Sequence, residues 1–177
     1  THTSGLPDQL PQNVALRCEH AGLDRFIEAV CELEPLFAPG TRVNYQSMGL
    51  LMLGAIMEQS TGQPLRDYLQ EALFAPLGMA HTTLGMPTGG LTASVRANDS
   101  PTETQSAVDS DYGWNSAYWR DLGAPWGGLH ATAGDLSRLL RHLLGVSPGP
   151  LSPAARWAMV RDQTARLPDL PTEHRLR

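Results

Sequence analysis

The sequence predicts a mainly α-helical fold, and three observations lead to this prediction. Apolar residues recur at helical spacing in several segments, whereas no convincing set of strands alternates along the chain. Apolar residues make up 41% of the composition, which is enough for a core and argues against wholesale disorder. A length of 177 residues is that of one ordinary domain, so we expect residues 1–177 to be a single domain or a fragment of one.

The first half of the chain contains three expected helices. Residues 23–34 carry apolar side chains at helical spacing and end before Pro35. Residues 48–59 are apolar on nearly every side, as in a buried helix, and Gly62 marks their end. Pro64 suits the first turn of a third helix, which Pro76 stops. Its expected apolar stripe is Leu65, Tyr68, Leu69, Ala72 and Leu73.

The second half begins with a segment for which the pattern is weak. Residues 86–128 are rich in Gly, Thr, Ser, Asp and Pro, so they form either a functional excursion or a region supported from outside the chain. A helix is expected over residues 132–144, with Thr132 as cap and Asp135 completing a capping box. Ser152 opens a last helix that runs to about Gln163. The expected inward side chains of these two helices are Leu136, Leu139, Leu140, Leu143, Leu144, Trp157 and Val160.

The helix over residues 48–59 needs neighbours on all of its sides. We expect that five shorter amphipathic helices do not suffice to cover it. The sequence therefore predicts an apolar face that something else has to bury.

Composition excludes several classes of function. The net charge is −5, and no basic block or aromatic-interleaved Arg stripe occurs, so no nucleic-acid partner is expected. All thirteen basic residues are Arg, a bias that high genomic GC would explain. Without Lys the chain has no amine base or Schiff-base former, and S-x-x-K, K-T-G and P-loop motifs are impossible.

Cysteine and histidine usage points to no metal site. Cys18 and Cys31 are expected to be two free, largely buried thiols, although a single bridge between them remains open. The six histidines show no ligand spacing, so we expect no metal. The longest apolar run, residues 48–57, is about half a membrane span, and residues 1–11 lack the features of a signal peptide. These features are typical of a soluble chain.

Two hydroxyl side chains, Tyr45 and Ser47, stand at the entrance of the most apolar helix. On spacing alone, the simpler interpretation is that Ser47 caps the helix and Tyr45 packs nearby. The alternative is a proton-transfer phenol with an oriented polar neighbour at a helix N-terminus.

Three ordered blocks favour the second interpretation for Tyr45. They are "HTSGLPDQLP", "FAPGTRVNYQSMGLLMLGAIMEQSTGQPLRDYLQEALFAPLGMAHT" and "GGLHATAGDLSRLLRHLL". Together they resemble the serine β-lactamase-related family, which comprises class C β-lactamases, DD-peptidases and related esterases. The resemblance implies the helical subdomain of an α+β β-lactamase/transpeptidase-like fold. Its sheet-forming ends would be missing from this chain.

The resemblance also implies site residues. Tyr45-Gln46-Ser47 matches the Y-x-N motif with Ser in place of Asn, which implies proton transfer by Tyr45 and orientation of substrate by Ser47. Gln9 aligns with a substrate-amide contact, unless it is a solvated loop residue. Trp126 lies where an aromatic residue builds a pocket wall, unless it serves ordinary loop packing.

The other two motifs of the family carry its nucleophile and its acyl pocket. We expect S-x-x-K to lie before Thr1 and the third motif, K-T-G or H-x-G, to follow Arg177. The first hypothesis is thus a segment of a serine hydrolase acting on an ester or amide such as a β-lactam, and inactive alone. The alternative is a complete, non-catalytic binding or assembly module, with a homodimer covering the apolar face. No cofactor is expected, and the resemblance fits either a periplasmic or a cytoplasmic protein.

Two further sets of residues invite a catalytic interpretation. Asp109, Asp111 and Asp121 lie in an acidic loop, where solvation is the expected fate of their carboxylates. His2 and Ser4 invite comparison with a His–Ser dyad, but no G-x-S-x-G turn supports one.

Overall fold

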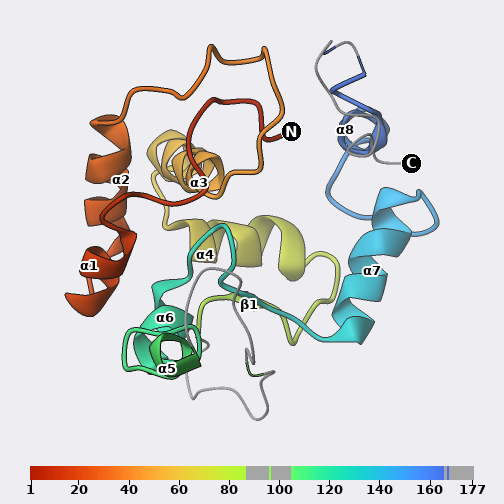
Figure 1. The fold of residues 1–177 in the computed structure, drawn as a ribbon. Coiled ribbons are helices and arrows are strands. Elements are labelled where there is room, and N and C mark those ends of the chain that lie inside the picture. The colour runs from red at the N-terminus through yellow and green to blue at the C-terminus, as the bar shows by residue number, and fades with distance from the viewer. Residues whose placement is uncertain (87–95, 97–104, 166, 168–177) are drawn as a thin grey trace.

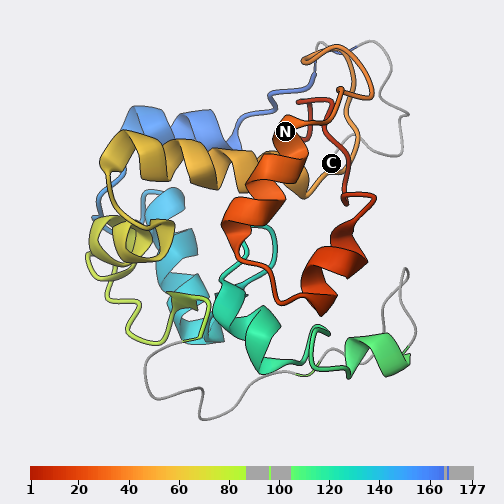
Figure 2. The ribbon, with the colours of Figure 1, turned by 90° about the vertical axis from the view of Figure 1, so that its left-hand side faces the viewer.

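The computed structural model describes residues 1–86, 96, 105–165 and 167. Its described part is mainly helical, as predicted. Most helices gather into one body, and α7 and α8 lie along one side of it (Figures 1 and 2). The helices of the body are α1 (Asn13–Cys18), α2 (Leu23–Cys31), α3 (Met48–Thr61), α4 (Leu65–Leu69), the π-helical turn η1 (Gln70–Phe74), α5 (Gln105–Val108) and α6 (Ala117–Leu122).

The core lies where α1, α2 and the start of α3 meet. Phe26 and Leu51 are almost wholly buried there, and Met48 places the beginning of α3 in the same cluster. The other buried members are Leu10, Leu16, Ala21, Ala29 and Val30. Burying such side chains contributes about 1.5–3 kcal/mol each, so this cluster fixes the position of the turn that precedes α3.

Helix α3 confirms part of the expectation and extends beyond it. Gly62 ends the helix in the left-handed conformation, with φ of 71°, and its N–H donates to the carbonyl of Glu58. Leu53 and Ile56 are 56% and 54% exposed, which confirms that the other helices do not cover α3 on all sides. The next helix widens into the π-helical turn η1 after Leu69, a change of geometry that the apolar stripe did not indicate.

A buried arginine joins α1 to the segment around α6, two helices that the sequence did not predict. Arg17 is fully buried, and its guanidinium carbon lies 5.7, 5.4 and 5.1 Å from the ring centroids of Tyr112, Trp114 and Trp119. Its Nε donates to the carbonyl of Tyr112 at 3.1 Å. Cation–π contacts gain strength when they are desolvated. Part of the weakly patterned segment is therefore packed on an arginine.

The arm is our name for residues 133–160, which include α7 (Ala133–Leu143) and α8 (Pro153–Val160). It follows a two-residue antiparallel ladder in which β1 (Thr83–Leu84) pairs with β2 (Leu129–His130). The register sets Thr83 opposite His130. The ladder ties the segment before the arm to the body.

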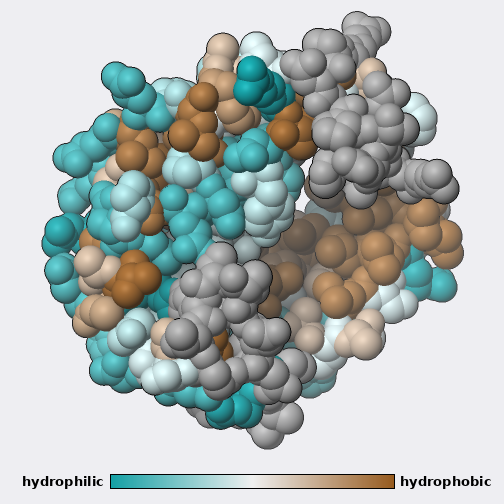
Figure 3. All heavy atoms as spheres, in the orientation of Figure 1, coloured by the Kyte–Doolittle hydropathy of each residue, from teal (hydrophilic) through white to brown (hydrophobic). Residues whose placement is uncertain are grey.

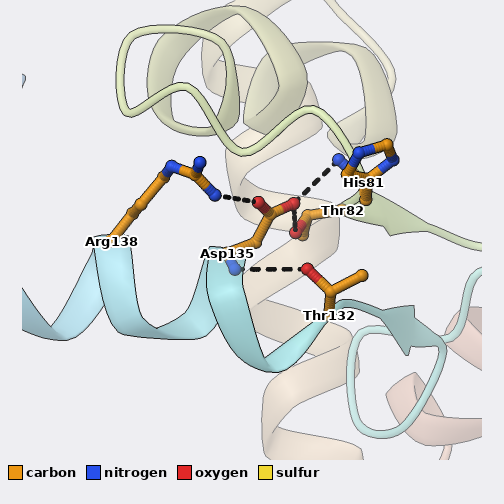
Figure 4. A network of polar contacts seen from close by, with 5 residues as sticks. All are labelled: His81, Thr82, Thr132, Asp135 and Arg138. Carbon is orange, nitrogen blue, oxygen red and sulfur yellow. Dashed lines mark hydrogen bonds and ion pairs between the residues drawn. The ribbon is translucent and has the colours of Figure 1, made fainter.

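A buried carboxylate fastens the start of α7 (Figure 4). Thr132 caps the helix as predicted, accepting from the Asp135 N–H at 3.2 Å. The Asp135 carboxylate does not return to the cap, so the predicted capping box is wrong. It accepts from the His81 N–H at 2.7 Å and the Thr82 hydroxyl at 2.9 Å, and it pairs with Arg138 at 2.7 Å.

This environment sets the charge of Asp135. Burial by itself would raise the pKa of the carboxyl. The hydrogen bonds from His81 and Thr82, together with the charges of Arg138 and His81, outweigh burial and hold the pKa below its ordinary value. Asp135 is therefore an ionised anchor between α7 and the segment before β1.

A buried histidine joins the two helices of the arm. His142 is 1% exposed; its Nε2 accepts from the Leu151 N–H at 3.1 Å, and its Nδ1 lies 3.2 Å from the Ser147 carbonyl. These contacts match a neutral imidazole with its proton on Nδ1. They close the turn between α7 and α8.

The expected inward faces of α7 and α8 are wrong in large part. Leu140 is 57% exposed and Leu144 75%, while Trp157 and Val160 are 66% and 56% exposed. Figure 3 shows apolar atoms gathered in a hollow between the arm and the body. Helical spacing identifies an apolar face of a helix, but it does not show whether another part of the chain covers that face.

Two smaller expectations have clear outcomes. Cys18 and Cys31 are free, but both are exposed, so the prediction of largely buried thiols is wrong. Among the residues that the structure describes, no helix combines the length and apolar content needed to cross a membrane.

Candidate active site

The turn Tyr45-Gln46-Ser47 leads directly into α3 and presents only its first side chain to solvent. Tyr45 is 64% exposed, whereas Gln46 and Ser47 are 5% and 7% exposed. Met48, the next residue, belongs to the core. Buried residues thus hold the turn in place, while the phenol of Tyr45 is exposed to solvent.

The ring of His2 lies against this phenol. The two ring centroids are 4.8 Å apart, and the planes are tilted by 38°. The imidazole Nδ1 lies 3.1 Å from the Gln46 carbonyl oxygen and 3.3 Å from the Gln46 amide nitrogen. His2 itself has a positive φ of 55°, a conformation that a few non-glycine residues, histidine among them, adopt.

The other two residues of the turn also have partners on the N-terminal segment. The Ser4 hydroxyl donates to Oε1 of Gln46, so Ser4 is not paired with His2 as a dyad would require. The Ser47 hydroxyl donates to Oδ1 of Asp8 at 2.6 Å.

Ser47 occupies the predicted N-cap position, but its side chain does not cap the helix. It occupies the N-cap position, and its carbonyl accepts from the Leu50 and Leu51 N–H groups. Its side chain makes no capping hydrogen bond; its hydroxyl instead donates to Oδ1 of Asp8.

The strap is our name for residues 2–8, which run beside residues 36–44. Backbone N–H groups of Asn44, Gly40 and Leu36 donate to the carbonyls of His2, Thr3 and Gly5 at 2.9, 2.8 and 2.8 Å. Gly5 has a φ of 83°, and a Cβ there would collide with the Phe37 carbonyl. The strap is thus fixed by main-chain bonds as well as by its side chains.

Gln9 follows the strap and is half-buried. Its Oε1 accepts from Nδ2 of Asn13 at 3.4 Å, a weak contact within its own loop. Its neighbour Asp8 links this loop to Ser47. The structure therefore brings the Gln9 loop next to the Tyr45 turn, and Gln9's predicted contact with a substrate amide stays a prediction.

Trp126 lies with the core rather than with the turn. Its ring centroid is 6.1 Å from that of Phe26 and 6.0 Å from that of Trp119. These contacts agree with the interpretation that Trp126 serves ordinary packing. Its role as an aromatic wall of a substrate pocket stays a prediction. The following Gly128 accepts the Gly85 N–H at 2.8 Å, so Trp126-Gly127-Gly128 forms the turn that enters β2.

One H-x-G sequence occurs within the chain itself. His20-Ala21-Gly22 forms the turn between α1 and α2. It is not on a strand, and the His20 ring stacks on Tyr118 with centroids 4.7 Å apart. This H-x-G therefore lacks the strand position that the family's third motif has.

The three candidate carboxylates have different ion-pair partners. Asp109 pairs with Arg96, Asp111 with His20 and Asp121 with Arg66. Exposed pairs of this kind contribute at most about 1 kcal/mol each. Within the described residues, no group of three or more His, Cys, Asp or Glu side chains could hold a metal ion.

Tyr118 and His130 have shifted pKa values because of their packing and of nearby charges. Burial raises the pKa of Tyr118, with the Arg17 charge acting in the opposite direction, and its hydroxyl donates to the Ala21 carbonyl. Burial and the Arg120 charge lower the pKa of His130. Neither group contacts the Tyr45 turn in the described structure.

The sequence did not single out His2, Asp8 and Gln46 as neighbours of the site. The segment "HTSGLPD" is rich in polar residues, which was a signal of a possible site. No local sequence pattern, however, indicates that these residues contact a turn about forty residues later. The resulting arrangement offers a phenol for proton transfer and oriented polar groups beside it.

Comparison with known proteins extends over nearly the whole chain. The family model described as Beta-lactamase matches residues 1–176. Penicillin-binding protein 4 of Amycolatopsis lactamdurans is 31% identical over 172 residues, which are 93% of this chain and 43% of that protein. The chain thus spans less than half the length of this relative.

Solved structures agree in fold. The penicillin-binding protein of Bacillus halodurans aligns with a TM-score of 0.66 at 21% identity, over 92% of this chain and 49% of that one. The D-amino acid amidase of Ochrobactrum anthropi SV3, complexed with L-phenylalanine, aligns with a TM-score of 0.63 at 26% identity, over 88% and 46%.

Proposed function

Because the chain belongs to the beta-lactamase family, we propose that it is the central segment of a serine hydrolase that forms an acyl-enzyme with an ester or amide substrate. The observation that carries this proposal is the exposed phenol of Tyr45 on a turn whose next two residues are buried. The family match over residues 1–176 includes this turn, which supports its interpretation as the Y-x-N motif.

In this function Tyr45 transfers a proton between the nucleophile and the leaving group. A phenol ordinarily loses its proton at a pKa of about 10, and a neighbouring cation favours the phenolate. The chain has no Lys, so the ammonium that would serve this purpose has to come from flanking polypeptide. Ser47 and Gln9 would then contact the acyl group, and Trp126 would support the pocket from the core.

The length of the relatives supports the same conclusion. More than half of the Amycolatopsis protein lies outside the region that this chain matches. The exposed apolar residues of the arm give that additional polypeptide something to bury. We infer that residues 1–177 alone do not turn substrate over, because the chain has no lysine that could activate a nucleophilic serine.

Hydrolysis of a chromogenic cephalosporin and of a p-nitrophenyl ester tests this function. The first step is to read the coding sequence before Thr1 for an in-frame Ser-x-x-Lys and to express the full-length gene product. We expect the full-length protein to hydrolyse at least one substrate and Tyr45→Phe to lower kcat by about 100-fold or more. Residues 1–177 alone should show no turnover.

Tyr118→Phe is the matched control, since it removes a phenol hydroxyl that binds the Ala21 carbonyl. It should leave kcat nearly unchanged. Turnover by the isolated chain that Tyr45→Phe abolishes would disprove the requirement for flanking polypeptide. Full activity of Tyr45→Phe in the longer protein would disprove the role of Tyr45.

A second candidate function is a non-catalytic assembly module, and the exposed apolar residues of the arm favour it. In that case two copies cover each other's apolar side, and residues 1–177 form a homodimer. Light scattering of the isolated chain separates the two candidates. A stable dimer that Leu140→Glu dissociates would support the module, whereas a monomer at all concentrations would rule it out.

A further inference from the structure

The strap contacts each residue of the Tyr45-Gln46-Ser47 turn with a different side chain. His2 lies against the Tyr45 ring, Ser4 donates to the Gln46 side chain, and Asp8 accepts from Ser47. A single short segment therefore contacts the turn residue by residue.

We propose that His2 and Asp8 are positioning residues of this site. His2 holds the Tyr45 ring in one orientation. Asp8 fixes the direction of the Ser47 hydroxyl and thereby the kind of substrate group that Ser47 accepts. This inference rests on the proposed function and assigns roles within the same site.

The claim for His2 follows from the exposure of Tyr45. A phenol that is 64% exposed has few neighbours that limit its rotamers, and the His2 ring at 4.8 Å is the aromatic contact that the described structure gives it. His2 is itself immobilised, because Nδ1 faces both the N–H and the carbonyl of Gln46. Either state of Nδ1 keeps a partner, since it can accept from the N–H or donate to the carbonyl.

Main-chain geometry supports the same role. His2 adopts a positive φ of 55°, and its carbonyl accepts the Asn44 N–H at 2.9 Å. Unusual backbone conformations persist only where the surroundings determine them, and they cluster at functional sites. The backbone of His2 is therefore fixed, and its ring can orient the exposed phenol of Tyr45.

The claim for Asp8 follows from the single proton of a serine hydroxyl. The hydroxyl has one proton and two lone pairs, and at 2.6 Å the proton is directed at the Asp8 carboxylate. Ser47 can then offer a substrate only lone pairs. An asparagine, which the resemblance has at this position, offers both N–H donors and a carbonyl acceptor. The Asp8–Ser47 pair thus selects substrates that present an N–H group here, such as an acylamino or amino group beside the scissile bond.

A ring-specific measurement on residues 1–177 tests the His2 claim without any turnover. The chain has four tyrosines, whose rings can be labelled with ¹³C and assigned by NMR. We expect His2→Ala to move the Tyr45 ring signals toward those of a free tyrosine and to leave Tyr118 unchanged. Unchanged Tyr45 signals in His2→Ala would overturn the claim.

His20→Ala is a closely matched control. His20 also has a positive φ, 51°, and its ring also stacks on a tyrosine, Tyr118. This variant should move the Tyr118 signals and leave those of Tyr45 in place. A change at Tyr45 in both variants would show a general loss of structure and would overturn a specific role for His2.

Steady-state kinetics of the full-length gene product give the second readout. His2→Ala should lower kcat on the order of tenfold with KM within about twofold, because a misoriented proton-transfer group slows chemistry more than binding. His2→Gln, which can still bond to the Gln46 backbone, should recover part of the loss. If His2→Ala and His2→Gln both lose folding stability and kcat to the same extent as each other, and both raise KM, the effect of His2 is structural. That result would overturn its role as a positioning residue.

A substrate pair tests the Asp8 claim. The kcat/KM of an ester with an acylamino group next to the carbonyl is compared with that of the same ester lacking the N–H. Asp8→Ala should lower this ratio about tenfold, the effect of one hydrogen bond. Asp8→Asn, which keeps an acceptor for the Ser47 proton, should retain most of the ratio.

The outcomes separate this inference from the proposed function. Turnover with an unchanged substrate ratio in Asp8→Ala overturns the Asp8 claim and leaves the hydrolase standing. Absence of turnover in the full-length protein overturns the hydrolase and the Asp8 claim with it. The NMR result for Tyr45 still decides the His2 claim in that case.

Discussion

The body and the arm of this molecule are held in place by different means. The body buries apolar side chains such as Phe26, Met48 and Leu51 around the beginning of α3. The arm buries two polar residues within α7, Asp135 and His142, and none within α8. Its large apolar side chains remain mostly exposed.

The difference separates orientation from stability. Hydrogen bonds to Asp135 attach the arm to residues 81 and 82, and those to His142 join its two helices. Each such bond contributes only about 0.5–3 kcal/mol net of desolvation. Burial of apolar surface is the dominant driving force of folding, and much of the arm's apolar surface is still exposed. The body is therefore expected to be stable by itself. The arm has a defined position, but we expect it to gain most of its stability only when another surface covers its apolar side chains.

The largest effect is expected in the body, at Arg17. Arg17→Ala removes the guanidinium from three aromatic rings and leaves the Tyr112 carbonyl without its Nε donor. We expect a loss of about 3 kcal/mol or more in the free energy of unfolding. Urea denaturation followed by tryptophan fluorescence measures it.

Arg25→Ala is the control, because Arg25 is exposed and pairs only with Glu28 at 3.4 Å among the described ion pairs. It should change the free energy of unfolding by less than about 0.5 kcal/mol. Similar losses for the two arginines would contradict the importance of burial in the body.

Leu51 provides the next test of the body. Leu51→Ala leaves a cavity in the core cluster, where Leu51 is 1% exposed, and should cost about 3 kcal/mol. The same urea denaturation checks this value. A cost below about 1 kcal/mol would show that the cluster is not the source of stability.

Asp135 is the test of how the arm is attached. Asp135→Asn weakens the bonds to His81 N–H and the Thr82 hydroxyl and removes the pair with Arg138. We expect about 2 kcal/mol of local stability to be lost. Hydrogen exchange should report faster opening of α7 amides while those of α2 keep their protection. Equal loss in both helices would show that arm and body unfold as one unit.

The pH dependence of the same anchor has a defined sign. The pKa of Asp135 is lower in the folded chain than its ordinary value of 3.8, so ionised Asp135 stabilises the arm fully above that value. The contribution is lost as the pH falls below 3.8 toward the folded pKa. The difference in α7 exchange between the parent and Asp135→Asn should therefore shrink on acidification. A difference that grows at low pH would contradict the lowered pKa.

The smallest effect is expected on the arm's open side. Leu140→Ala removes a side chain that is 57% exposed, so it should change the stability of the isolated chain by less than about 0.5 kcal/mol. In the full-length gene product the same change should cost about 2 kcal/mol or more, because flanking polypeptide would cover Leu140 there. Equal small effects in both contexts would show that Leu140 stays exposed.

The sequence was most informative where an element depends on its own residues. Gly62, Thr132 and Ser152 marked helix ends correctly, because caps and left-handed terminators act within one turn. The apolar start of α3 was likewise assigned to the core, as Met48 and Leu51 show.

Periodicity failed where the partner of a face lies elsewhere. The leucine stripe of α7 has the spacing of a buried face, but the described chain provides nothing to cover Leu140 or Leu144. Helix α6 was missed because its stability depends on Trp119 packing near Arg17, about a hundred residues earlier.

The candidate site was predictable only in part for the same reason. The family resemblance singled out Tyr45 and Ser47. The contacts of His2 and Asp8 depend on how the strap lies beside residues 36–44, and no local pattern contains that register.

Hydrogen exchange of the arm in two contexts tests most directly whether flanking polypeptide completes this molecule. The amides of residues 133–160 are compared between the isolated chain and the full-length gene product, with those of α2 as the internal reference. We expect protection of the arm to rise by at least about tenfold in the longer protein, while α2 changes little. Equal protection of the arm in both proteins would contradict the claim and would leave its apolar side without a covering partner.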